Sequence, residues 1–133
     1  MGAWGTGSFE NDAALDWVWQ LESDSDGSVL RVAFSAAVEG SGEPWGMSDN
    51  GCNALAAGEV VAAALGSPVS DLPEEVSEWL SRNPQVVDDE LRLAAVGAVA
   101  RVRDRSELRD LWEEAGADDW LAAVDDLITR LSE

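Results

Sequence analysis

The first seventeen residues, MGAWGTGSFENDAALDW, constrain the fold of this chain more than any other stretch. They hold three glycines, two tryptophans and an Asn-Asp pair, at a terminus where most domains carry frayed sequence. Glycine lets a backbone lie close against a neighbouring element, and Trp4 and Phe9 supply large apolar surfaces. We therefore predict an ordered arm over residues 1–10 that docks without being helical on a helical body over residues 11–133.

The first helix of that body is predicted to begin at Asn11 and to end near Glu22. Asn11 is a favoured N-cap residue, and the charge of Asp12 suits the positive end of the helix dipole. Asp16 lies one turn further on and shares an outer face with Asp12. The buried stripe follows the helical spacing of three and four residues and consists of Ala14, Trp17, Val18 and Leu21.

The remainder of the chain repeats this amphipathic spacing between Gly, Pro and Asn breaks. The pattern predicts an all-α, single-domain bundle of about six or seven helices, with those around 54–65 and 87–103 in the middle. Residues 39–51 are predicted to form a loop rich in Gly, Ser and Asp. The later helices are expected over about 28–39, 52–65, 71–82, 86–103, 104–115 and 120–131.

The segment from Glu22 to Ser28, ESDSDGS, has the acidic beginning of a calcium-binding loop. Such a loop needs a bidentate Glu six residues after its glycine, and the residue six after Gly27 is Ala33. A polar turn is the better interpretation.

Glu59 is the only charged residue between Gly51 and Ser70. An unpaired buried charge is too costly to keep, so Glu59 is either exposed at the helix edge or buried with partners. If it is buried, the expected partners are the amides of residues 2–5, the Trp4 indole, or an arginine such as Arg92. A catalytic role for the carboxylate is a third alternative.

Acidic side chains outnumber basic ones by 27 to 8, and the formal net charge is −19. Such a charge repels nucleic-acid phosphates and anionic membranes, and it attracts basic protein surfaces or cations. Four arginines near one helix junction form a basic island that could bind an anion, although the acidic residues around it favour ion pairs within the molecule. These are Arg101, Arg103, Arg105 and Arg109.

The chain has neither lysine nor histidine. These absences remove Ser-His and Cys-His nucleophile pairs, imidazole-bound zinc, Schiff-base chemistry and Walker-type phosphate loops. Catalysis would depend on carboxylates and an oxygen-bound divalent metal, for which Asp12, Asp16 and Glu59 are the weak candidates. A helix cap explains Asp12 and Asp16 without a metal, so we expect no cofactor.

The amino-terminal residues resemble the signature of a family of small bacterial proteins, common in high-GC genomes and described as a domain of unknown function. The family typically begins Gly-Ala-Trp-Gly-x-Gly-x-Phe-x-Asn-Asp-x-Ala-x-Asp-[Trp/Phe]. Later segments are also similar to the family, among them AAGEVVAAALG around Glu59, LPEEVSEWL, SELRDLWEEAG and DDWLAAVDDL. The resemblance implies no chemistry. The matching positions are Gly2, Ala3, Trp4, Gly5, Gly7, Phe9, Asn11, Asp12, Ala14, Asp16 and Trp17.

Two classes of function remain open. The first is a non-catalytic interaction or regulatory domain whose acidic surface meets a basic protein and neutralises it. The second is the carboxylate-based, metal-assisted enzyme, which the missing residue types disfavour. The single cysteine, Cys52, and the lack of a signal peptide indicate a cytoplasmic protein. The sequence identifies neither the partner nor the oligomeric state.

Overall fold

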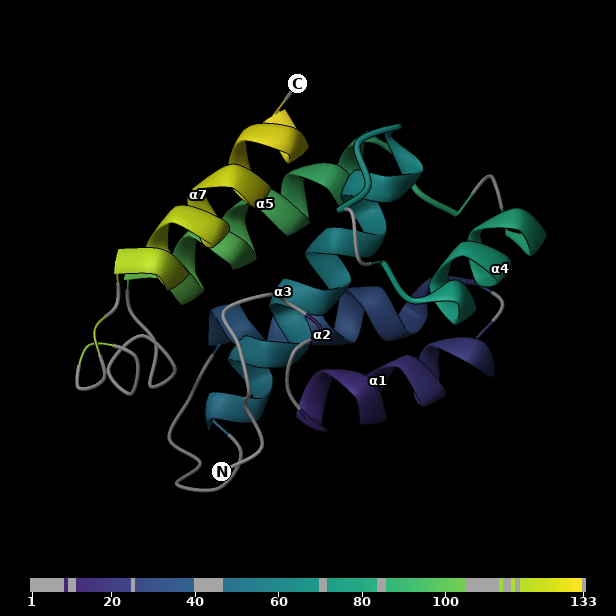
Figure 1. The fold of residues 1–133 in the computed structure, drawn as a ribbon. Helices are drawn as coiled ribbons and strands as arrows, with labels where there is room; N and C mark the ends of the chain where they lie inside the picture. Colours follow the sequence, from purple (N-terminus) through teal and green to yellow (C-terminus); the bar gives the residue numbers. More distant parts are fainter. Residues whose placement is uncertain are drawn as a thin grey trace.

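The described part of the chain contains six helices and no strand, which confirms the predicted all-α fold. Most of the helix expected over about 104–115 lies outside the described residues. Figure 1 shows the fold. The computed structural model describes residues 9, 12–24, 26–39, 47–69, 72–83, 86–104, 113, 116 and 118–132. The helices are α1 (Asp12–Glu22), α2 (Ser28–Glu39), α3 (Met47–Ala64), α4 (Glu74–Arg82), α5 (Asp89–Asp104) and α7 (Asp118–Ser132).

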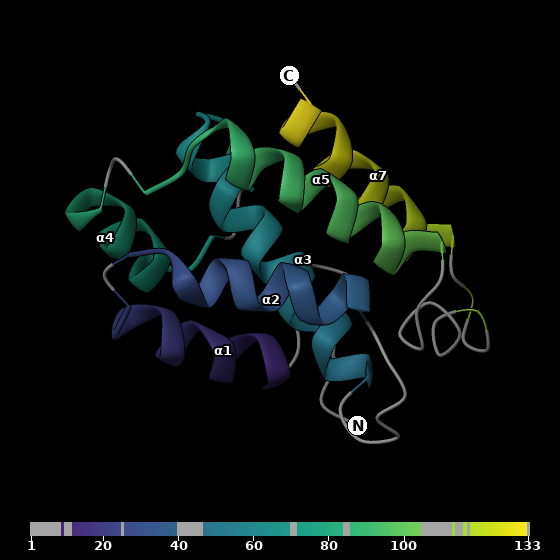
Figure 2. The same cartoon turned by 180° about the vertical axis from the view of Figure 1, so that it is seen from behind.

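Helix α3 runs through the middle of the molecule and contacts all five other helices. Helix α5 contacts α2, α3 and α7. In both views of the ribbon, α1 is the outermost helix on the side away from α5 and α7 (Figures 1 and 2). The predicted central position of the helices around 54–65 and 87–103 is confirmed.

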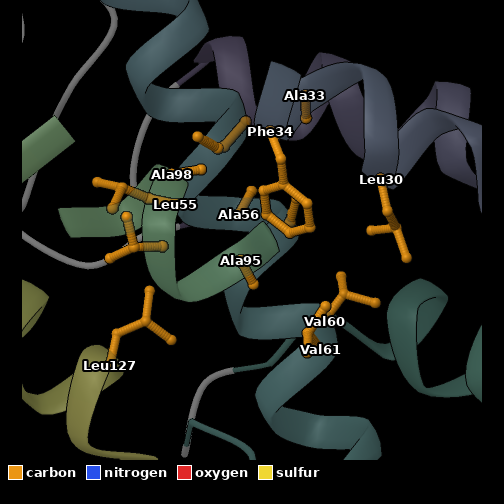
Figure 3. Packing of buried hydrophobic residues seen from close by; sticks show 14 of the residues in the cluster. Leu30, Ala33, Phe34, Leu55, Ala56, Val60, Val61, Ala95, Ala98 and Leu127 are labelled. Carbon is orange, nitrogen blue, oxygen red and sulfur yellow. The ribbon is translucent and has the colours of Figure 1, made fainter. Parts of the chain in front are cut away.

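One hydrophobic core joins these helices. Figure 3 shows Phe34 and Leu30 of α2 facing small and branched side chains of α3 and α5. Gly58 explains how closely the helices approach, because a Cβ at this position would lie 2.9 Å from Val99 and 3.2 Å from Leu127. The predicted stripe of α1 is confirmed, with Ala14, Trp17, Val18 and Leu21 all buried.

Two details of the sequence prediction are wrong. Helix α3 begins at Met47, inside the segment predicted to be a loop. A first helical turn tolerates polar residues because its N–H groups have no intrahelical acceptors. Helix α5 was expected over about 86–103 but starts later than that, and its Leu93 and Ala94 are exposed. That helix begins at Asp89, where the Asp88 carboxylate accepts a 2.8 Å hydrogen bond from the Leu91 N–H.

The segment between α1 and α2 is the polar turn that the sequence predicts. The Asp24 carboxylate accepts hydrogen bonds from the Gly27 N–H at 2.7 Å and from the Ser28 hydroxyl at 2.9 Å. The Asp26 carboxylate accepts a bond from the Ser28 N–H, and the Ser28 hydrogen bonds lower the pKa of Asp26. The Asp24 carbonyl also accepts a 2.8 Å bond from the indole of Trp79, which ties this turn to α4.

Replacing Gly27 with alanine is expected to lower the free energy of unfolding by about 1–3 kcal/mol. Gly27 has a φ of +81°, and a Cβ there would overlap the Cγ1 of Val86. Gly66 is the matched control, since it has a φ of +98° and nothing within 4 Å of its Cβ position. Urea unfolding followed by circular dichroism gives both values. Equal losses for Gly27→Ala and Gly66→Ala would show that the Val86 contact contributes nothing.

Candidate functional site

Glu59 lies in the interior of the molecule, on α3, with 3% of its surface exposed. Its carboxylate faces the Arg130 guanidinium of α7, with Nη1 2.7 Å from Oε1 and Nη2 3.0 Å from Oε2. Two parallel charge-assisted hydrogen bonds of this kind fix both the position and the orientation of the two groups. The buried alternative therefore describes Glu59, with an arginine as partner.

Arg130 connects three parts of the chain. Besides Glu59, it donates through Nη1 to the Ser67 carbonyl at 3.2 Å and through Nε to Asp126 at 2.8 Å. Only 13% of its side chain is exposed. The hydrogen bonds to Glu59 are the main reason that the pKa of Arg130 is raised above its usual value. The cluster Glu59–Arg130–Asp126 thus fastens the end of α7 to α3 and to the turn after α3.

The arginine named from the sequence, Arg92, does not hold Glu59. Its Nη1 donates instead to the Leu131 carbonyl at 3.2 Å, near the carboxyl end of α7. Arg130 was not predicted as the partner of Glu59, although its position in the sequence indicated that it could be. Arg130 follows Asp126 by four residues and is close to Leu127 and Leu131, two buried residues of α7. An arginine at this position can extend its side chain toward the interior.

Of the other two candidate carboxylates, only Asp16 has a described side chain, and it does not join Glu59. Asp16 is exposed on α1, and the side chain of Asp12 lies outside the described residues. Among the side chains that the structure describes, no group of three or more acidic or cysteine residues is arranged to hold a metal ion. The Glu59 carboxylate is held in an ion pair with Arg130, so it is poorly suited to act as a base or as a nucleophile. The geometry gives no support to the carboxylate-based enzyme.

The amino-terminal signature is described only in part. Phe9 is 5% exposed and belongs to the core, and Trp17 is 3% exposed. Asp12 is the first residue of α1. The predicted arm over residues 1–10 otherwise lies outside the described residues. So do the predicted roles of Gly2, Trp4, Gly5, Gly7 and Asn11.

Acidic side chains cover the outside of the described molecule. Apart from Glu59 and the half-buried Asp24, every acidic side chain that the structure describes is exposed.

Arg103 of the arginine island forms ion pairs within the molecule, with Asp104 at 2.8 Å and with Asp125. The bonds to Asp125 are the main cause of the raised pKa of Arg103. The intramolecular pairing predicted for the arginine island holds for Arg103. Arg101 is exposed and makes no ion pair with the described side chains, and Arg105 and Arg109 lie outside the described residues.

Two further surface features were not anticipated from the sequence. Trp19 of α1 is 76% exposed, the largest exposed fraction among the big apolar side chains that the structure describes. Trp19 falls outside the apolar stripe of its helix, and this position could have predicted its exposure from the sequence. A small hollow of about 200 Å³ lies between α1, α2 and α3, and its lining includes Trp17, Val32 and Asn53. Within the described part, the buried Oδ1 of Asn53 accepts no hydrogen bond.

Among the described helices, none has both the length and the apolar character that crossing a lipid bilayer requires. Searches of the curated proteins and of the solved structures give no match to the chain. The family model described as domain of unknown function DUF4259 matches residues 2–123. This match spans nearly the whole sequence, and the chain therefore belongs to the DUF4259 family.

Proposed function

We propose that this chain is a non-catalytic interaction domain whose acidic surface binds and neutralises a basic protein. The observation that carries the proposal is the division of charge in the molecule. Exposed carboxylates lie on α1, α4, α5 and α7. The acidic side chain described on α3, Glu59, is buried. Arg130, Arg103 and Arg92 meanwhile bond to groups within the chain.

This distribution selects among partner classes. With a net charge of −19, the domain repels nucleic acids and anionic membranes at long range. The same field accelerates encounter with a positively charged protein and disfavours acidic competitors. Cys52 is buried and is the single cysteine of the sequence, which suits a reducing compartment, so we place this function in the cytoplasm.

The test is capture of partners on the immobilised full chain from a lysate of the organism that encodes it. We expect enriched proteins with isoelectric points above about 9, released as NaCl rises to about 0.5 M, because salt screens exposed charges. Beads coated with polyglutamate are the control for simple ion exchange. The proposal fails if the proteins enriched over that control are neutral or acidic and remain bound in high salt.

A further inference from the structure

The outward face of α1 carries an apolar pair at its centre. Trp19 is 76% exposed and Leu15 is 39% exposed. Because they are four residues apart on one helix, their side chains are neighbours on the same face. Helix α1 is also the outermost helix on its side of the bundle (Figures 1 and 2).

Two exposed acidic side chains lie next to Trp19. Asp16 and Glu22 are each three residues from Trp19, so they lie within one helical turn of it, and both are exposed. Glu22 also lines a shallow hollow that it shares with Glu78, Ser81 and Arg82 of α4. The surface formed by Leu15, Asp16, Trp19, Glu22 and Glu78 is called the α1 face below. It has an apolar centre and a rim of three carboxylates, with one cation, Arg82, beside Glu22 and Glu78 in the hollow.

The part of the fold that the structure describes gives no structural use for Trp19. The core contacts of α1 are made by the stripe of Ala14, Trp17, Val18 and Leu21, all at most 3% exposed. Tryptophan is one of the side chains enriched at the energetic centres of protein interfaces, because it buries a large area at a small cost in side-chain entropy. Val32 and Leu93 are also exposed, but isolated apolar residues at a surface are common and need no partner.

We propose that the α1 face docks a basic amphipathic segment of the partner protein, an inference that rests on the proposed function. Apolar side chains of the segment cover Leu15 and Trp19, and an arginine or lysine stacks on the Trp19 indole. Further cations meet Asp16, Glu22 and Glu78 at the rim. A second copy of the chain is a poor occupant, because each copy carries a net charge of −19.

The probe is a fluorescent helical peptide of about five turns, with leucine on one face and arginine on the other. Fluorescence anisotropy at about 50 mM NaCl gives its Kd for the full-length chain. Trp19→Ala is expected to raise the Kd at least about tenfold, and Trp19→Phe by less, since an aromatic ring remains. Leu93→Ala, an exposed apolar change on another helix, should leave the Kd unaltered.

The rim is tested with charge-matched variants. Asp16→Asn combined with Glu22→Gln is expected to weaken binding about three- to tenfold at low salt, since both lost charges border the docking site. Asp89→Asn combined with Glu90→Gln removes the same charge from α5, and it should change the Kd less than about twofold. An arginine–serine peptide without leucine should bind more weakly than the leucine–arginine peptide.

Several outcomes overturn the inference. The docking site is wrong if the leucine–arginine peptide does not bind, or if Trp19→Ala and Leu93→Ala give the same Kd. It is also wrong if light scattering shows self-association that Trp19→Ala abolishes, which would assign the face to a second copy. The proposed function falls separately, through the capture experiment, in which no particular face is assumed.

Discussion

Replacing Arg130 with methionine is expected to lower the free energy of unfolding by about 3–5 kcal/mol, the usual loss when one partner of a buried ion pair is removed. The Glu59 carboxylate, which is 3% exposed with Arg130 in place, would lose both of its guanidinium bonds. The Ser67 carbonyl would lose its bond from the same guanidinium. Chemical denaturation followed by circular dichroism measures the change.

Arg103→Met is the matched control. Arg103 also pairs with an aspartate of α7, Asp125, but both groups are substantially exposed. Water then replaces the lost partner, and the loss of stability should be far smaller. A double variant, Glu59→Met with Arg130→Met, should recover much of the stability, because an apolar pair has no charge to desolvate. If Arg130→Met is no more harmful than Arg103→Met, the pair does not fasten α7 to α3.

The contrast between local and distant contacts explains what the sequence predicts. The buried positions Ala14 and Leu21 follow from helical spacing, which depends on residues within two turns. The Glu59–Arg130 pair joins residues 71 apart in the chain. Spacing shows that Glu59 needs a partner if it is buried, but it does not select one of eight arginines. That choice depends on how α7 lies against α3, which is tertiary information.

At the start of α3, even a local feature of the structure could not be predicted from composition. Gly, Ser, Asp and Asn residues are typical of both loops and first helical turns. Local composition therefore left the segment around Met47 ambiguous, and the structure continues the helix through it. Trp19 is a different case, because its outward position follows from the same spacing that places Trp17 inward. The pattern locates an exposed tryptophan, whereas its use depends on the charges that surround it.

Trp79→Ala is expected to cost about 3–5 kcal/mol of unfolding free energy. Trp79 is fully buried in α4, and its indole N–H donates to the Asp24 carbonyl at 2.8 Å. The alanine variant leaves a large cavity and also releases the turn between α1 and α2. Trp79→Phe keeps most of the apolar volume but leaves that carbonyl without its indole donor, so its cost should be about 1–2 kcal/mol. Thermal and urea unfolding give both values.

The same truncation at Trp19 should change the unfolding free energy by no more than about 0.5 kcal/mol. Trp19 is 76% exposed, whereas Trp79 is fully buried. Trp19→Ala therefore removes an indole from the solvent-exposed surface, and Trp79→Ala removes one from the core. A stable Trp19→Ala protein that binds the basic peptide poorly would separate recognition from folding. A Trp19→Ala protein as unstable as Trp79→Ala would make Trp19 a structural residue, and its proposed role as the anchor of the α1 face would then have to be abandoned.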